Sequence, residues 1–307
     1  MTSAPVALFV YNRPWHTRRT VEALLANLDA SETPLYIFSD APRDVAASGA
    51  VVEVRSFLRK ITGFKSISII ERENNYGLAR SIIDGVTHVC EKYGRAIVME
   101  DDLVTSTYFL KFMNEGLEKY QDEQRVISIH GYVYPVEQSL PETFFLKGAD
   151  CWGWATWKRG WDLFEPDGAK LLAELKRRKL THQFDFDGGY PYTRMLRNRI
   201  AGKNNSWAIL WYASAFLQDK LTLYPGRSLV HNIGLDGSGT HCSETKGYSG
   251  ELARSPITVE DIVVEECLIT RQQFVKFHKR TRSSLPVRVA NKVLSRIQRM
   301  SKAEYVK

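Results

Sequence analysis

The sequence lacks the cysteine pairs that mark a zinc site or a disulfide framework. Its four cysteines lie far apart along the chain and form no C-x-x-C pair (Cys90, Cys151, Cys242 and Cys267). A metal-binding or disulfide scaffold would need closer, paired spacings. The cysteine content therefore favours a reducing compartment.

Long apolar runs and an N-terminal export signal are also missing. Nowhere do about 18 consecutive apolar residues occur, the length that a membrane-spanning helix requires. No basic segment followed by a long apolar stretch opens the chain. We therefore expect a cytoplasmic protein that neither crosses a membrane nor is exported by a conventional signal.

The glycine loops that commonly bind phosphates are absent as well. No G-x-G-x-x-G segment and no P-loop occurs among the 307 residues, although the net charge of +7 favours an anionic partner. A nucleotide-binding protein with this sequence must neutralise phosphate charge in another way. With 44% hydrophobic residues, the chain can bury a sizeable core as one large domain or two modest ones.

The chain does contain a repeating pattern of apolar strands and amphipathic helices. Four short apolar segments, each typical of a strand covered on both faces, start at intervals of roughly 30 residues, the length of a βαβ unit. These segments are residues 6–11, 35–38, 67–70 and 96–99. The pattern predicts an α/β fold with a mainly parallel sheet flanked by helices.

Polar residues follow these strands where each one ends. Arg13 follows the first strand, Asp40 the second, and Glu100-Asp101-Asp102 the fourth. The carboxyl ends of parallel strands meet at one edge, where open α/β sheets bind ligands. Three adjacent carboxylates repel one another, and burying them unpaired would cost several kcal/mol. We therefore expect a cation beside them; a solvated acidic turn before a helix is the alternative.

The second half of the chain is rich in tryptophan. Six of the seven tryptophans lie between Trp152 and Trp211. Part of this group is expected in the core, and Trp152 and Trp154 are candidates for an aromatic wall against a sugar ring. Packing in the core alone is the alternative.

Residues 231–241 are rich in glycine and contain two histidines, which predicts a mobile loop that closes over a ligand. His231 and His241 are candidates for contact with a diphosphate or for a second metal ligand. A purely structural histidine is the alternative for each.

The C-terminal tail is strongly basic. Between Arg271 and Lys307 there are eleven Lys or Arg residues and one acid, Glu304. After Pro286 the apolar residues fall on one helical face, which predicts a basic amphipathic helix on an anionic membrane surface. A solvated or packing helix is an alternative, and nucleic-acid binding is the least favoured because the tail has no recognised motif.

The predicted sheet is of the kind that binds nucleotides, but it has no glycine loop to hold their phosphates. The acids at the end of its fourth strand therefore indicate that a metal ion neutralises the diphosphate of a bound nucleotide. This combination resembles the GT-A fold of glycosyltransferases. Glu100-Asp101-Asp102 resembles the E-D-D motif of the N-acetylglucosaminyltransferase I family. Gly153-Trp154, and later Gly234-x-x-Gly237 followed by His241, match that family in order. Bacterial surface-polysaccharide and lipopolysaccharide glycosyltransferases are similar in the same way.

The resemblance implies an organisation in three parts. Residues 1–135 would form the nucleotide-sugar-binding half, and residues 136–265 the acceptor-binding half of the same GT-A domain. Residues 266–307 would form the basic amphipathic tail.

The resemblance also implies roles for single residues. Asp102 would ligate Mn²⁺ or Mg²⁺, Asp101 would contact the ribose, and Glu100 would contact hydroxyls of the donor sugar. Asp40 would accept a hydrogen bond from the base. Further contacts with the nucleotide sugar would come from Tyr11, Asn12, Arg13, Gly77, Leu78 and His241.

The catalytic base is the part that the resemblance does not locate. The family has an aspartate before a tryptophan, but the corresponding segment here, residues 207–210, contains no acid. Asp187 is the substitute candidate and Asp185 the next; helix capping or turn formation is the alternative for both. Inversion would require such a base, and a retaining reaction stays open.

We therefore expect a metal-dependent, inverting glycosyltransferase. It would move a hexosyl or N-acetylhexosaminyl group from a nucleotide sugar, in particular a UDP-sugar, to a glycan or glycolipid acceptor at the inner membrane face. A nucleotidyltransferase is one alternative, although its usual glycine-rich N-terminal loop is missing. A non-catalytic glycan- or membrane-binding protein on the same scaffold is another.

Overall fold

Strands and helices alternate through the first half of the chain. The computed structural model describes residues 3–236 and 246–281. The four strands that the sequence predicts are confirmed, with small shifts at their ends. In chain order the elements are β1 (Val6–Val10), α1 (Pro14–Leu25), the 3-10 helix η1 (Ala30–Glu32), β2 (Pro34–Ser39), α2 (Val45–Leu58), β3 (Ser66–Glu71), α3 (Leu78–Tyr93), β4 (Arg95–Glu100), β5 (Leu103–Thr105) and α4 (Phe109–Lys119).

The second half adds further strands and a group of short helices. In chain order these are β6 (Val126–His130), β7 (Thr143–Lys147), β8 (Trp154–Trp157), α5 (Lys158–Trp161), α6 (Gly168–Arg177), α7 (Thr181–Phe184), α8 (Tyr192–Ile200), α9 (Ala208–Leu217), β9 (Leu221–Pro225), β10 (Val230–Asn232), the 3-10 helix η2 (Lys246–Tyr248) and α10 (Leu268–Thr281).

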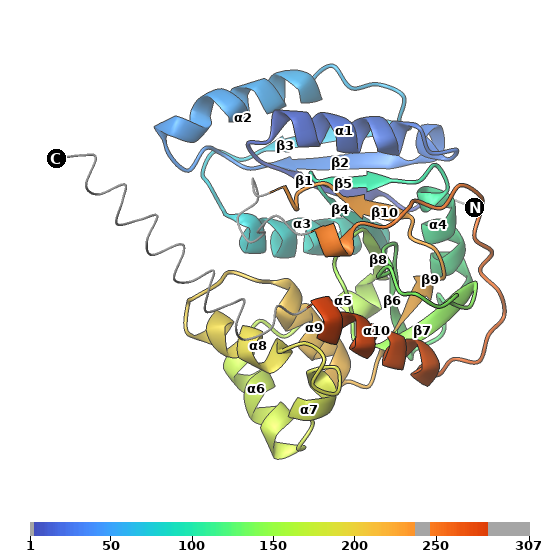
Figure 1. Cartoon of the computed structure of the whole chain (residues 1–307). Helices are drawn as coiled ribbons and strands as arrows, with labels where there is room; N and C mark the ends of the chain where they lie inside the picture. Colours follow the sequence, from blue (N-terminus) through green and yellow to red (C-terminus); the bar gives the residue numbers. More distant parts are fainter. Residues whose placement is uncertain (1–2, 237–245, 282–307) are drawn as a thin grey trace.

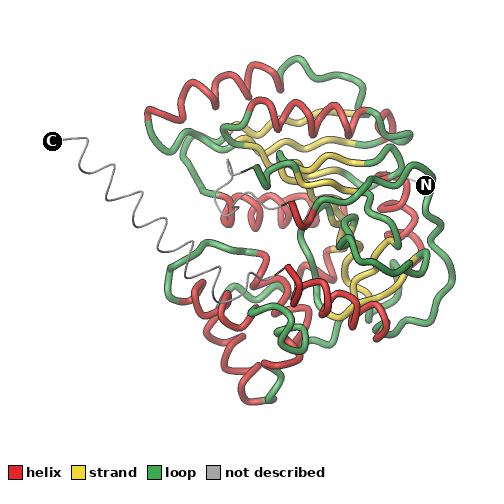
Figure 2. Tube along the Cα trace, in the orientation of Figure 1, coloured by secondary structure: helices red, strands yellow, loops and turns green. Residues whose placement is uncertain are grey.

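One eight-stranded sheet runs through both halves, in the order β3-β2-β1-β4-β8-β6-β9-β7 (Figure 2). β3, β2, β1 and β4 pair in parallel, and β6 pairs in parallel with β9. β8 runs antiparallel to both of its neighbours, β4 and β6, so β4 and β6 point the same way. β7 is antiparallel to β9. The fold is therefore α/β with a mainly parallel central sheet, as the sequence predicts.

Helices cover both faces of this sheet, which explains why the strands are apolar throughout. Figure 1 shows α1 and α2 on one face and α3 on the other. One core packs side chains of α1 and α2 against strand residues such as Leu8 and Leu35. The other packs the apolar side of α3, for example Ile82 and Val86, against Phe9. All five residues of β1 are buried as a result.

The insertion of β8 brings a distant loop to the ligand-binding edge of the sheet. Trp154, the first residue of β8, pairs with Val98 near the end of β4 and with His130 at the end of β6. The loop before β8 therefore lies at the edge where the parallel strands end. Because the sheet continues across residue 135, the two proposed halves share one sheet; their boundaries stay a prediction.

The short helices α6 to α9 form a separate layer beside the second half of the sheet, and α10 packs against it (Figure 1). Leu171, Leu196, Phe216 and Phe274 contribute to its core. The predicted amphipathic helix after Pro286 lies outside the described residues. Within the described residues, no helix is both long and apolar enough to cross a membrane.

Candidate functional site

The three acids predicted from the sequence lie at the carboxyl end of β4, between β1 and β8. β4 delivers Glu100, its last residue, and the chain turns there so that Asp101 and Asp102 precede β5. Asp101 is only 4% exposed. The acids are thus held at the centre of the sheet edge and do not form a solvated turn.

Arg13 supplies a cation to this acidic group. Its Nη2 donates to Oδ2 of Asp102 at 2.9 Å and also bonds to Oδ1 of Asp101. Burial disfavours the charged guanidinium, but the two carboxylates outweigh this effect and raise the pKa of Arg13 above its ordinary value. The other amino group, Nη1, is buried without a hydrogen-bond partner among the described residues. An unsatisfied buried donor of this kind is suited to an anionic ligand.

The acids differ in their electrostatics. Burial, and then the charges of Asp102 and Asp101, raise the pKa of Glu100 to about 8. Burial also raises the pKa of Asp101, although Arg13 opposes the shift. The burial of Glu100 and the neighbouring charges therefore favour the protonated form of its carboxyl group.

Backbone contacts fix the acids to neighbouring elements. Thr20 of α1 donates its hydroxyl to the carbonyl of Asp101 at 2.9 Å. The amide of Tyr11 donates to Oδ2 of Asp101 at 3.3 Å. On the other side, the amide of Ile233 donates to the carbonyl of Asp102 at 2.8 Å. Segments far apart in the chain therefore hold the acids in place.

Gly234 lies directly against the carboxylate of Asp102. A Cβ at this position would stand 2.1 Å from Oδ2 of Asp102 and 3.0 Å from Nη1 of Arg13. Only glycine therefore fits without displacing the acid. Gly234, the first glycine of the motif that the sequence predicts late in the chain, is thus brought to the acidic group through β10, which pairs with β5.

A contact between a histidine and an aspartate, which the sequence did not predict, follows from the same segments. Nε2 of His16 is 3.0 Å from Oδ2 of Asp236. His16 lies three residues after Arg13, so it is about one helical turn further along and on the same side of α1. This spacing could have marked His16 as a candidate site residue. His231 lies on β10, where burial lowers its pKa. His241 and Gly237 lie outside the described residues.

Asp40 organises the start of α3. Its two carboxylate oxygens accept hydrogen bonds from the amides of Tyr76 and Gly77, both at 2.8 Å, and from Ala41 at 3.0 Å. Gly77 has φ of +70°, a conformation that favours glycine. The structure therefore connects Asp40 with Gly77, while a contact of Asp40 with a nucleotide base stays a prediction.

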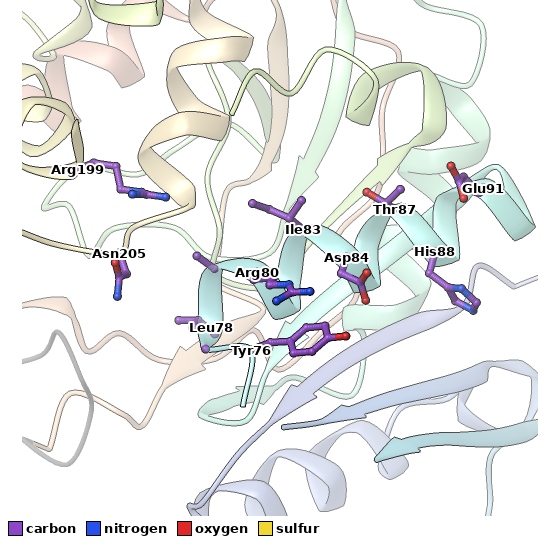
Figure 3. Close-up of a pocket in the computed structure, with 12 residues that line it drawn as sticks. Tyr76, Leu78, Arg80, Ile83, Asp84, Thr87, His88, Glu91, Arg199 and Asn205 are labelled. Carbon is purple, nitrogen blue, oxygen red and sulfur yellow. The ribbon is translucent and has the colours of Figure 1, made fainter. Parts of the chain in front are cut away.

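A cavity of about 730 Å³ begins at this turn and follows α3. Figure 3 shows Tyr76, Leu78 and Arg80 at one end, with Arg199 and Asn205 facing α3 from the opposite side. The lining therefore combines the amino-terminal end of a helix with two arginines. Both features attract anions, and the arginines were not among the predicted site residues.

The two candidate bases, Asp185 and Asp187, have partners in the helical layer. Asp187 pairs with Arg271 of α10 at 2.9 Å, and Arg271 is buried. Oδ1 of Asp185 accepts a hydrogen bond from the amide of Thr193 at 2.5 Å. The contact of Asp185 fits the alternative of turn formation, and the ion pair of Asp187 was not predicted; the catalytic role of both stays a prediction.

The predicted aromatic wall divides into two environments. Trp154 is fully buried and packs against Trp161, Trp207 and Trp211. As a correction to the prediction, Trp154 belongs to the core, because β8 lies between two strands and helices cover it. Trp152 is partly exposed and stays a candidate for the wall.

The acidic group can be compared with the needs of a divalent metal ion. Among the described residues, no group of three or more His, Cys, Asp or Glu side chains is arranged to hold a metal. The donor chemistry of Asp102 nevertheless fits Mn²⁺ or Mg²⁺, since Mg²⁺ is commonly held by one or two carboxylates together with substrate phosphates. Asp102 would hold such an ion, and Arg13 would compete with it for Oδ2.

Comparisons with known proteins give only distant similarities. No protein-family model matches the chain, and no curated protein matches its sequence. One similar structure is the mannosyltransferase PcManGT from Pyrobaculum calidifontis in complex with GDP-Man and Mn²⁺, with 12% identity and a TM-score of 0.33 over 44% of this chain and 36% of that one. Another is TarS 1–349 from S. aureus, with 10% identity and a TM-score of 0.41 over 75% and 60%.

TarS 1–349 in complex with UDP is similar over 45% of this chain and 38% of that one, with 12% identity and a TM-score of 0.32. The matched part thus spans between 36% and 60% of these structures. Similarity at these TM-scores is too low to assign a function to this chain.

Proposed function

We propose that this protein is a glycosyltransferase that moves a sugar from a nucleotide sugar to a glycan or glycolipid acceptor. The observation that carries the proposal is the bridge from Arg13 to Asp101 and Asp102 at the centre of the sheet edge. The buried Nη1 of Arg13, which has no hydrogen-bond partner within residues 3–236 and 246–281, supports an anionic ligand there. GDP-Man and UDP, the ligands of PcManGT and TarS, are anions of this class.

The donor would bind along the edge formed by β2, β1 and β4. The turn held by Asp40 and the first amides of α3 would face the diphosphate, since a helix amino terminus favours negative charge. Arg13 would stabilise the charge that develops on the departing diphosphate. Asp101 would contact the ribose, and the carboxyl group of Glu100 would contact donor-sugar hydroxyls.

The remaining contacts predicted with the nucleotide sugar, from Tyr11, Asn12, Leu78 and His241, are part of the same proposal. Asp102 would hold a divalent ion, which supplies Lewis-acid stabilisation of the leaving group when bound.

We further propose a UDP-sugar donor, an inverting reaction and a role in surface-polysaccharide or lipopolysaccharide synthesis. The basic tail would hold the enzyme at the inner membrane face. The likeness to the N-acetylglucosaminyltransferase I family stays a prediction.

A thermal-shift screen tests the proposal. UDP, GDP, UDP-glucose, UDP-N-acetylglucosamine and GDP-mannose are added with and without Mn²⁺. A ligand at a hundred times its dissociation constant stabilises the fold by about 2.7 kcal/mol, which is roughly 5 °C in Tm for a chain of this size. We expect at least one nucleotide to give such a shift and Mn²⁺ to enlarge it.

The substitution Asp102→Asn should remove the part of the shift that depends on Mn²⁺. Asp122→Asn is the control, because Asp122 is exposed and precedes β6 at the opposite end of the sheet. The proposal fails if no nucleotide changes Tm in the wild type. The metal assignment alone fails if Asp102→Asn and Asp122→Asn respond to Mn²⁺ equally.

A further inference from the structure

Asp150 is an acid at the ligand-binding edge that the sequence did not reveal. It lies in the loop between β7 and β8, and its side chain is 27% exposed. The pairing of Trp154 with Val98 places this loop beside the end of β4. The amide of Gly131, at the end of β6, donates to the carbonyl of Gly153 at 2.7 Å. Asp150 is thus on the side of Glu100–Asp102 opposite to β1 and β2, where the donor is proposed to bind.

Four aromatic side chains, here called the aromatic cluster, lie beside this loop. Their ring centroids are 4.7 Å apart for Tyr132 and Trp152, 5.3 Å for Tyr132 and Tyr134, 6.1 Å for Trp152 and Tyr248, and 6.0 Å for Tyr134 and Tyr248. All except Tyr132 are partly exposed. Partly exposed rings with a polar group at their side suit a sugar, whose C–H face packs on the rings while its hydroxyls form hydrogen bonds.

The position of the Asp150 carboxylate is defined by its neighbours. Oδ1 accepts a hydrogen bond from the amide of Cys151 at 2.8 Å. Oδ2 lies 4.0 Å from Nδ1 of the fully buried His130. Nε2 of His130 accepts a hydrogen bond from the amide of Trp152 at 3.1 Å, which assigns the proton of the neutral ring to Nδ1. That Nδ1–H has no hydrogen-bond partner among the described residues, so it can stabilise negative charge on the acid.

The charge of Asp150 affects the pKa of tyrosine hydroxyl groups in and beside the aromatic cluster. Burial is the main cause that raises the pKa of Tyr132 and Tyr134, and Asp150 adds to the rise in both. Burial is also the main cause that raises the pKa of Tyr224 at the end of β9, and Asp150 adds to it through its charge and through a hydrogen bond with the Tyr224 side chain. These phenols therefore stay protonated near the acid, and the hydroxyl of Tyr132 donates to the backbone carbonyl of Tyr248 at 2.7 Å.

We propose that the aromatic cluster binds the acceptor sugar and that Asp150 is the general base of the transfer. This inference rests on the proposed function. The carboxylate of Asp150 takes the proton of an acceptor hydroxyl, and the oxygen of that hydroxyl forms a bond to C1 of the donor sugar. The bond from C1 to the diphosphate oxygen breaks, and its electron pair leaves with the nucleoside diphosphate. Asp150 then returns the proton to solvent.

The two sides of the sheet edge would therefore have separate tasks. β2, β1 and β4 hold the donor, whereas the loop before β8 and the end of β6 hold the acceptor. Asp150 takes the role that the sequence prediction gave to Asp187, which pairs with Arg271 in the helical layer.

Steady-state kinetics with UDP-glucose, UDP-N-acetylglucosamine and GDP-mannose test the inference. The acceptors are water and the p-nitrophenyl glycosides of glucose, galactose and N-acetylglucosamine. Removal of a general base commonly lowers the rate by about 10²–10⁴-fold. We expect Asp150→Asn to lower kcat by at least about 100-fold while KM for the nucleotide sugar changes less than about threefold. Asp122→Asn should match the wild type.

A second variant addresses the acceptor directly. Trp152→Ala should raise KM for the glycoside by about fivefold without changing KM for the donor, since loss of one stacked ring costs about 1 kcal/mol. This variant keeps the inference testable if Asp150→Asn does not fold.

The outcomes separate the two proposals. If the wild type binds and turns over a nucleotide sugar but Asp150→Asn has the same kcat, the general-base role is wrong. Loss of kcat in Asp187→Asn with Asp150→Asn unaffected would return the role to Asp187. An unchanged acceptor KM in Trp152→Ala would refute the acceptor site. If no nucleotide sugar binds to the wild type, the proposed function fails and the inference fails with it.

Discussion

The contact between Gly234 and Asp102 predicts a large effect from a single added methyl group. In Gly234→Ala the new Cβ would stand 2.1 Å from Oδ2 of Asp102, whereas ordinary contacts begin at 3.4 Å. The carboxylate must therefore retreat by about 1.3 Å. Nη1 of Arg13, at 3.0 Å from the same Cβ, restricts the directions in which it can move.

This movement would break the bond of 2.9 Å between Arg13 and Asp102. The loss of a charged hydrogen bond costs about 1.5–3 kcal/mol, which corresponds to a Tm lower by roughly 3–6 °C for a chain of this size. Because Asp102 and Arg13 are both proposed to face the nucleotide, the affinity for UDP in the presence of Mn²⁺ should also fall by about tenfold, or about 1.4 kcal/mol.

Differential scanning fluorimetry gives the Tm, and isothermal titration calorimetry gives the affinity for UDP. Gly49→Ala is the matched control, because Gly49 lies within α2 and its Cβ would meet nothing within 4 Å. That variant should bind UDP like the wild type and be slightly more stable, by about 0.5–1 kcal/mol. The reasoning is refuted if Gly234→Ala has the Tm and the UDP affinity of Gly49→Ala.

Two further predictions concern the helical layer and α10. Burial lowers the pKa of His278 to about 4, so the unfolded chain, with an ordinary pKa of about 6.5, binds the extra proton as the pH falls through this range. When the pH falls from 7.5 to 5, the unfolding free energy of the wild type should therefore decrease by about 2 kcal/mol more than that of His278→Phe. Urea titrations at the two pH values measure this, and an equal decrease in both proteins would contradict the prediction. Asp187→Asn leaves the buried Arg271 with Glu266 as its remaining acidic partner, so it should lower the unfolding free energy by about 1–3 kcal/mol at pH 7. An unchanged urea midpoint would show that this ion pair is not stabilising.

Much of the fold could be predicted because its signals are local. β1 is apolar at every position, since both of its faces are covered by helices, and an uninterrupted apolar run is visible in the sequence. Polar residues at the strand ends were visible in the same way. Parallel pairing then brings Arg13, Asp40 and the three acids to one edge, as the structure shows.

Other parts of the site depend on contacts between distant segments. The sequence predicted a cation beside the acids without saying which group provides it. The structure shows that Arg13, which precedes Asp101 by 88 residues, is one such cation. Tryptophan density alone could not separate the buried Trp154 from the partly exposed Trp152. Asp187 had no visible partner in the sequence, since Arg271 lies 84 residues later.

The sequence by itself determined the α/β class, the parallel arrangement of the first strands and the acidic strand end, because periodicity and strand-end chemistry are properties of neighbouring residues. Only the tertiary structure decided that β8 enters antiparallel between β4 and β6. That pairing carries the loop with Asp150 to the sheet edge. The pairing of β10 with β5 brings Gly234 against Asp102. Strand order depends on packing among segments far apart in the chain, and no local pattern encodes it.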